Sequence, residues 1–143
     1  MKKLLLLIVL AIAGHQAPAQ TLRAAQVPAA VKATFKAKFP AVKTNTWEKE
    51  NGDFEAGFTL HGAPVSAVIA PGGELKETET GMAVAQLPAA VRATLARDFK
   101  TAKITEAATL VSGAGTTTYE AEVRQGGQVR DVVFDAGGRV LKK

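Results

Sequence analysis

The sequence predicts an α+β protein in which two tandem repeats build one antiparallel sheet, with two helices packed on one face. Two observations lead to this prediction. Residues 27–39 (VPAAVKATFKAKF) and residues 87–99 (LPAAVRATLARDF) are identical at seven of thirteen positions, which indicates an internal duplication. Each copy is followed by stretches of alternating apolar and polar residues that end in glycine turns, as the strands of antiparallel sheets do.

Residues 1–19 have the pattern of a signal peptide. Lys2 and Lys3 precede an apolar run, and residues 17–19 fit a cleavage motif that ends at Ala19. The apolar run is shorter than the roughly 20 residues that cross a bilayer, so a membrane anchor is the weaker alternative. We therefore expect a periplasmic or secreted protein that has no membrane insertion after cleavage near Ala19.

Composition restricts the functions open to the single domain expected over residues 20–143. The chain has no cysteine, which excludes thiolate metal sites and cysteine-based catalysis. Removal of Lys2 and Lys3 reduces the 18 basic residues to 16, against 13 acidic residues, and the basic residues are dispersed. Nucleic-acid-binding proteins usually carry a clustered basic stripe. We therefore expect no nucleic-acid partner and interpret the charges as an ordinary solvated surface.

Each repeat, at about residues 25–80 and 85–143, is expected to begin with a helix. Apolar residues recur every four positions in both copies and form one stripe on each helix: Val27, Val31, Phe35 and Phe39, then Leu87, Val91, Leu95 and Phe99. Pro28 and Pro88 suit the first turn of a helix. Pro40 ends the first helix, and the second helix has no such stop.

Three or four strands are expected after each helix, which gives a sheet of six to eight strands. The expected strands cover residues 42–50, 53–60, 65–70 and 74–78, then 104–111, 119–124, 129–135 and 139–141. Asn51-Gly52 predicts a type I′ hairpin turn, because both positions of that turn need positive φ. Residues 70–73 (APGG) are interpreted as a type II turn. Residues 112–115 are an insertion in the second repeat and are interpreted as a flexible hairpin tip.

Several motifs together resemble those of the PepSY-like family, which is also described as beta-lactamase-inhibitor-like. They are Leu87-Pro88-Ala89-Ala90-Val91, Trp47, Tyr119-Glu120-Ala121-Glu122-Val123 and Val133-Phe134-Asp135-Ala136-Gly137-Gly138. The resemblance covers nearly all of the chain after residue 19. It implies a small exported protein of two αβ repeats, and the family's second name implies inhibition of a hydrolase by a sheet face or a loop.

The sequence offers no convincing catalytic group. His61 is the only histidine after residue 19, and we expect it in an exposed turn beside Gly62. Ser66 and Ser112 lack the G-x-S-x-G setting of a nucleophilic serine. We therefore predict that the chain is not an enzyme and uses no cofactor.

Three apolar residues on the predicted strands are candidates for binding. Trp47 is the only tryptophan, and it is either an exposed anchor for a partner or a core residue. Val68 and Val133 occupy equivalent positions in the two repeats. If Trp47 is exposed, the three form an apolar patch of the kind that marks an interaction site.

Carboxylates form a second candidate site. Glu55, Glu120 and Glu122 lie at alternating strand positions and point to the polar side. They either bind a hard cation such as calcium or belong to a solvated face that is balanced by nearby basic residues (Lys49, Arg124, Arg130). We favour the solvated face and predict no metal site.

These observations predict a non-catalytic exported binding module that presents a sheet face to a protein or peptide partner. Hydrolase inhibition is one specific version of this prediction. The alternative is an envelope protein that binds a small ligand or a cation through the acidic strand face. The sequence gives no basis for choosing an oligomeric state.

Overall fold

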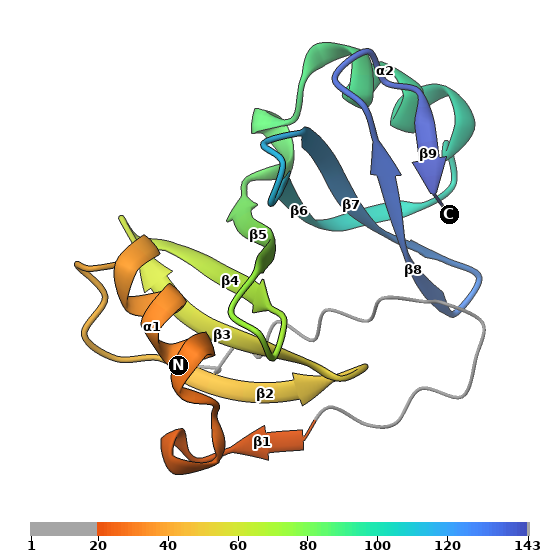
Figure 1. Cartoon of the computed structure of the whole chain (residues 1–143). Coiled ribbons are helices and arrows are strands. Elements are labelled where there is room, and N and C mark those ends of the chain that lie inside the picture. Colours follow the sequence, from red (N-terminus) through yellow and green to blue (C-terminus); the bar gives the residue numbers. More distant parts are fainter. Residues whose placement is uncertain (1–19, 143) are drawn as a thin grey trace.

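Residues 20–142, described by a computed structural model, form one nine-stranded antiparallel sheet with its strands in sequence order (Figure 1). The first half contains β1 (Gln20–Leu22), α1 (Ala29–Lys38), β2 (Thr46–Glu50), β3 (Asp53–Leu60), β4 (Ala63–Ile69) and β5 (Leu75–Met82). The second half contains α2 (Ala89–Asp98), β6 (Lys103–Ser112), β7 (Thr117–Gln125), β8 (Gln128–Phe134) and β9 (Val140–Lys142). The predicted α+β class is confirmed, and the predicted signal peptide lies outside the described residues.

The sheet has more strands than the six to eight that we predicted. The additional strand is β1, in which Leu22 lies opposite Trp47 of β2. A strand of three residues is too short to show an alternating pattern, so the sequence did not reveal it. The fourth strand was also predicted too short, since β5 runs to Met82 rather than to Thr78.

The two helices begin at equivalent positions, two residues later than predicted. Pro28 and Pro88 have extended backbones and precede the first helical residue. Short 3₁₀ helices, η1 (Ala24–Gln26) and η2 (Val84–Gln86), come before them, and Val27 and Leu87 lie directly after these short helices. No helix within residues 20–142 is long and apolar enough to cross a membrane.

The tight turns agree with the predictions at one site and differ at another. Asn51 and Gly52 both have positive φ, at 50° and 87°, as a type I′ turn requires. In the turn after β4, positive φ occurs at Gly73 (94°) and not at Gly72. The prediction of a type II turn there was wrong, because that turn needs positive φ at its third residue.

Each helix is held to a glycine turn by a threonine. Thr34 of α1 donates a hydrogen bond to the carbonyl of Gly73 (2.6 Å). Thr94 of α2 donates to the carbonyl of Gly138 (2.7 Å). A Cβ atom on Gly138 would lie 2.4 Å from the carbonyl oxygen of Ala90, so only glycine allows the turn to approach the helix this closely.

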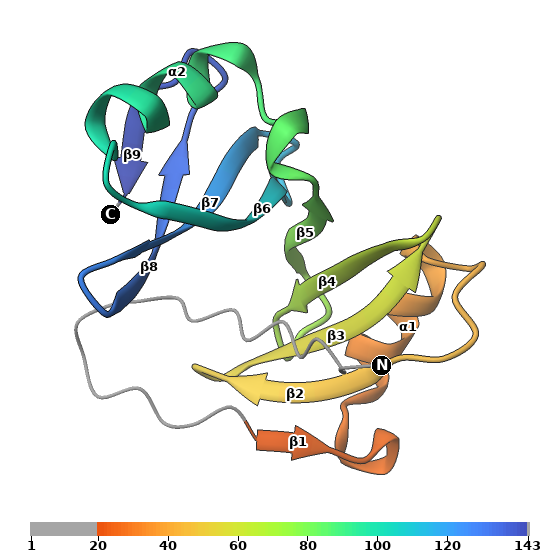
Figure 2. The ribbon, with the colours of Figure 1, turned by 180° about the vertical axis from the view of Figure 1, so that it is seen from behind.

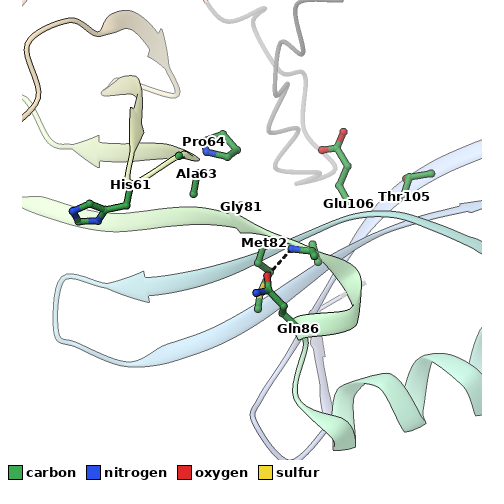
Figure 3. Close-up of a pocket in the computed structure, with 11 residues that line it drawn as sticks. His61, Ala63, Pro64, Gly81, Met82, Gln86, Thr105 and Glu106 are labelled. Atoms are coloured by element: carbon green, nitrogen blue, oxygen red, sulfur yellow. Dashed lines mark hydrogen bonds between the residues drawn. The ribbon is translucent and has the colours of Figure 1, made fainter.

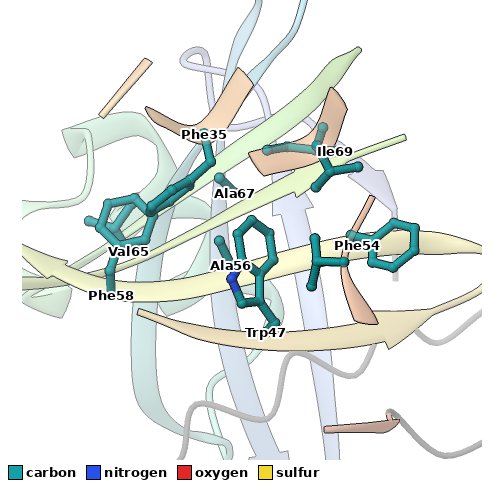
Figure 4. Packing of buried hydrophobic residues seen from close by; sticks show 10 residues of the cluster. Phe35, Trp47, Phe54, Ala56, Phe58, Val65, Ala67 and Ile69 are labelled. Carbon is teal, nitrogen blue, oxygen red and sulfur yellow. The ribbon is translucent and has the colours of Figure 1, made fainter. Parts of the chain in front are cut away.

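Two apolar cores lie side by side under one sheet. In the first, Phe35 of α1 contacts Trp47 and Phe58 edge-on, with ring centroids 5.3 and 5.2 Å apart (Figure 4). In the second, the buried residues come from α2, the residues on either side of it, and β6 to β8: Leu87, Val91, Leu95, Phe99, Ala107, Ala121, Val123, Val132 and Phe134. The two cores are separate clusters, and β5 connects the strands of one to those of the other.

The insertion at residues 112–115 packs against β5. The backbone N–H of Gly113 donates a hydrogen bond to the carbonyl of Lys76 (2.7 Å). Ser112 continues β6 far enough to lie opposite Glu77 of β5. We interpreted this loop as a flexible tip, but it lengthens the pairing between the two halves of the sheet.

Strand register assigns each side chain to one of two sheet faces. Ala56, Ala67, Thr78 and Val111 lie opposite one another in turn across β3 to β6, and Met82 continues this face opposite Ala107. Both apolar cores lie on this face, which we call the helix face. Figure 1 shows α1 in front of β2 to β4, and Figure 2 shows the same strands from behind. The opposite face carries neither helix, and we call it the open face.

Candidate binding face

Most of the acidic residues of the chain lie on the open face. The chain has 13 acidic residues. Three of them lie in turns or on α2: Glu74, Asp98 and Asp135. Strand register places the other ten on the open face, from β2 to β8: Glu48, Glu50, Asp53, Glu55, Glu77, Glu79, Glu106, Glu120, Glu122 and Asp131. The candidates Glu55, Glu120 and Glu122 therefore belong to one much larger acidic surface.

Several of these carboxylates face one another directly. Glu48 lies opposite Glu55, and Glu122 lies opposite both Glu106 and Asp131 on its two neighbouring strands. Like charges at opposite positions of an antiparallel sheet are destabilising. The arrangement therefore lowers the stability of the isolated protein.

Glu79 lies near the middle of the acidic surface. It projects from β5 between Ser66 of β4 and Leu110 of β6. Only 5% of Glu79 is exposed, and no ion pair or side-chain hydrogen bond within residues 20–142 involves its carboxyl group. Burial raises the pKa of Glu79 to about 8, and the charges of Glu120 and Glu55 add to the effect. A buried carboxyl group without a cation is an uncommon and costly feature.

The pKa values of several carboxyl groups near Glu79 are raised as well. Burial, followed by the charges of nearby acids, raises the pKa of Glu55 and of Glu120 to about 7. A hydrogen bond from Ser66 opposes the shift at Glu55. Burial also raises the pKa values of Glu77 and Asp131.

The cations that reach the acidic surface lie away from Glu79. Lys76 pairs with Asp53 (2.6 Å). Arg124 pairs with Glu122 (2.8 Å), and Thr105 donates a hydrogen bond to the same carboxylate. Burial would raise the pKa of Glu122, but these two donors outweigh it and lower the pKa.

Two of the three basic residues expected to balance the acids lie on the other face. The Lys49 ammonium lies 5.4 Å from the centre of the Phe54 ring. The Arg130 guanidinium lies 5.7 Å from the centre of the Phe99 ring. Both rings belong to the helix-face cores. The expectation of a balanced acidic face was therefore wrong, except at Arg124.

The apolar patch that an exposed Trp47 would have formed with Val68 and Val133 is not present. Trp47 lies on the helix face and is only 6% exposed, so it is a core residue and not an exposed anchor. Val68 and Val133 do lie on the open face. Val68 is flanked by Glu55 and Glu77, and Val133 by Glu120 and Lys142. The open face therefore combines half-buried valines with the acidic surface.

His61 lies in a turn, as predicted, with a φ of 50°. It lines a shallow hollow of about 450 Å³ with Gly81, Met82 and Glu106 (Figure 3). No group of three or more acidic or histidine side chains within residues 20–142 is arranged to hold a metal ion. The hollow has one imidazole and one carboxylate, and the hydroxyl-bearing Thr105 also lines it.

We did not identify Glu79 from the sequence, although the alternation of residues around it is a signal for it. Residues 75–82 (LKETETGM) alternate acids with threonines, and Glu77 and Glu79 share one side of that pattern. Because we ended the strand at Thr78, Glu79 fell outside it. The alternation of acids in the other strands likewise indicates that they share a face, once all the strands belong to one sheet.

No protein-family model matches this chain, and no curated protein sequence matches it. Three solved structures from Bacteroides are similar in fold, and each comparison covers 81% of this chain. One is described as a candidate periplasmic protein of Bacteroides eggerthii (TM-score 0.74, 18% identity, 86% of that chain covered). Another is a DUF2874 family protein of Bacteroides uniformis (TM-score 0.74, 16% identity, 87% of that chain covered). The third is a BLIP-like protein of Bacteroides fragilis (TM-score 0.68, 20% identity, 84% of that chain covered). The likeness supports a BLIP-like fold.

Proposed function

We propose that this chain is an exported, non-catalytic binding module whose open face takes a protein or peptide partner. The observation that carries the proposal is Glu79, which lies in the middle of that face, is 5% exposed and has no ion-pair partner within residues 20–142. Arrangements that lower the stability of the free protein are typical of functional surfaces, because a partner can supply the missing interactions. Half-buried Val68 and Val133 add apolar area to the same face.

Export is part of this proposal. The pattern of residues 1–19 supports it, and so does the fold shared with a candidate periplasmic protein. Fusion of residues 1–22 to a reporter that is active only after export tests it directly. An exported reporter supports the proposal, whereas a reporter retained in the cytoplasm contradicts it.

Hydrolase inhibition is the most specific version of the proposal. Its support is the description of one structural neighbour as BLIP-like, together with the resemblance of the sequence motifs. Titration of the protein into assays of beta-lactamases and other envelope hydrolases tests this version. Stoichiometric inhibition that is lost on Val68→Arg substitution supports it, and unchanged activity across the panel removes it while leaving the binding module in place.

A position-specific cross-linking experiment tests the binding module itself. One photoreactive residue replaces Val68 on the open face, and another replaces Lys36, which is exposed on α1. Both proteins are irradiated in a periplasmic extract. We expect discrete adducts from position 68 and none from position 36. Adducts from position 36 alone would show that the helix side is the binding surface.

A cation or small ligand is the less favoured alternative. The acidic surface is its only support, and the carboxylates of residues 20–142 form no group that is arranged to hold a metal. Addition of millimolar calcium is therefore expected to leave the melting temperature unchanged. A calcium-dependent rise would favour the alternative.

We also infer that the chain arose by tandem duplication. The support is the paired contacts of Thr34 with Gly73 and of Thr94 with Gly138, which recur at equivalent positions of the two halves. The resemblance to PepSY-like proteins rests on the same turn and core residues. Both inferences concern how the sheet is built rather than what it binds.

A further inference from the structure

We propose that the partner contacts the open face through a cationic segment, which places a lysine or arginine side chain against Glu79. This inference rests on the proposed function, because it assumes that the open face is the binding surface. It goes further by stating the chemistry of the partner. Three features of the open face support it: its charge, the surroundings of Glu79, and its poor fit to other occupants.

The open face has a large excess of negative charge. Ten acidic residues lie on it, and four basic side chains within residues 20–142 reach it: Lys76, Lys103, Arg124 and Lys142. Lys76 and Arg124 are already paired with Asp53 and Glu122. A partner with complementary positive charge is attracted to such a face before contact, and its cations replace interactions that the free protein lacks.

Glu79 supplies the specific position for one cation. Only 5% of the residue is exposed, and it has no ion-pair partner within residues 20–142. The hydroxyl of neighbouring Ser66 is engaged by Glu55. Leu110, on the other neighbouring strand, is itself only 7% exposed and makes the surroundings of Glu79 apolar on that side. A guanidinium group would further satisfy both oxygens of the carboxylate.

Other occupants fit this surface poorly. Nucleic acids and anionic membranes would be repelled by the ten carboxylates. A bare metal ion would need several carboxylates directed at one point, and no such group exists within residues 20–142. A purely apolar segment would cover the carboxyl group of Glu79 without giving it a hydrogen-bond or ion-pair partner. A cationic protein segment satisfies both the charge and the burial.

Selection from a random peptide library displayed on phage tests this inference. The complete protein after residue 19 is immobilised, and selection is carried out at pH 8 in about 150 mM salt, where weak long-range attraction is screened. Selected peptides are then synthesised and their affinities measured for the natural protein, for Glu79→Gln and for Glu74→Gln. Glu74 is an exposed acid in the turn before β5 and provides the matched control.

We expect the selected peptides to be enriched in arginine and lysine. Glu79→Gln is expected to weaken their binding by at least about tenfold, because truncation of a buried charge pair is costly, while Glu74→Gln leaves it unchanged. Affinity is also expected to fall between pH 8 and pH 6, as Glu79, Glu55 and Glu120 become protonated. Melting curves of each variant confirm that it is folded.

Three other outcomes would overturn the inference, and they separate it from the proposed function. If neutral peptides are selected and Val68→Arg abolishes their binding, the open face is the binding surface but the partner is not cationic. If the selected peptides bind Val68→Arg and Glu79→Gln unchanged, both proposals are wrong. A selection that yields no binding peptide also contradicts both.

Discussion

Glu79 is the residue at which stability and function are most clearly opposed. Its carboxyl group is neutral when the protein is most stable, and it must lose its proton to bind a cation. Burial raises its pKa to about 8 in the folded protein, whereas the pKa in an unfolded chain is close to the ordinary value of 4.5. Between these two pH values the folded state binds more protons than the unfolded state, so stability falls as pH rises.

The first prediction follows from this difference. Glu79→Gln removes the ionisation, so we expect it to raise the free energy of unfolding by at least about 1 kcal/mol at pH 8 and to have little effect at pH 5. Urea denaturation of both proteins at the two pH values measures this. Glu74→Gln, in an exposed turn, is expected to leave the free energy of unfolding unchanged at both pH values. A Glu79→Gln protein that is less stable at pH 8 would show that the carboxylate has a cationic partner.

Trp47 illustrates the opposite situation, in which a residue suspected of binding is structural. Its ring is buried against Phe35 in the first core. The second prediction is that Trp47→Ala lowers the free energy of unfolding by about 3 to 5 kcal/mol, as other large core truncations do. Denaturation followed by circular dichroism measures the loss. A decrease of less than about 1 kcal/mol in the free energy of unfolding would mean that Trp47 is not packed as described.

At the scale of elements, β5 is the strand that joins the two halves. It pairs with β4 on one side and with β6 on the other, and it carries Glu77 and Glu79 on the open face. The insertion after β6 extends this joint, since Gly113 is hydrogen-bonded to Lys76. The one marked difference in length between the two halves therefore lies where they meet.

The third prediction concerns this joint. A Cβ atom on Gly113 would lie 2.1 Å from the carbonyl oxygen of Leu75, so Gly113→Ala must push the loop away from β5. We expect a loss of about 2 kcal/mol or more in the free energy of unfolding. Gly72→Ala is the matched control, because a Cβ atom there meets nothing within 4 Å. Equal stability of the two variants would contradict the packing of this loop.

The sequence predicted the helices and most strands because each is defined by local periodicity and by turn chemistry. Trp47 was left undecided for a physical reason. Alternation shows that Trp47 and Lys49 share a face, but only the pairing of β2 with β3 shows that this face is covered by a helix. The acidic surface was underestimated for the same reason, since it becomes visible only when seven strands are brought into register.

At the scale of the whole molecule, charge is divided between two sides. The open face carries ten of the acidic residues, whereas many basic residues lie on the helices or beside the cores: Lys32, Lys36, Lys38, Lys49, Arg92, Arg97 and Arg130. Dispersed along the sequence, these charges resemble an ordinary surface. In the folded protein they create a dipolar molecule that orients a cationic partner toward the open face.

The fourth prediction follows from this division. Association with a basic peptide is expected to slow as the salt concentration rises, because screening weakens attraction to the open face. Stopped-flow measurements between low and high salt report the association rate. A paired charge change that leaves the net charge constant, Glu77→Lys with Lys36→Glu, is expected to slow association. An unchanged rate would mean that net charge alone, rather than its distribution, governs the encounter.

The most direct measurement for the central claim is an NMR titration of the isotope-labelled protein with a hexaarginine peptide at pH 8. We predict that the largest chemical-shift changes occur at Ser66, Glu79 and Leu110, on the three adjacent strands around the unpaired carboxyl group. The amides of α1 and α2 are expected to change little. Shifts that are confined to the helices, or to the exposed acids of turns, would contradict the assignment of the open face as the binding surface.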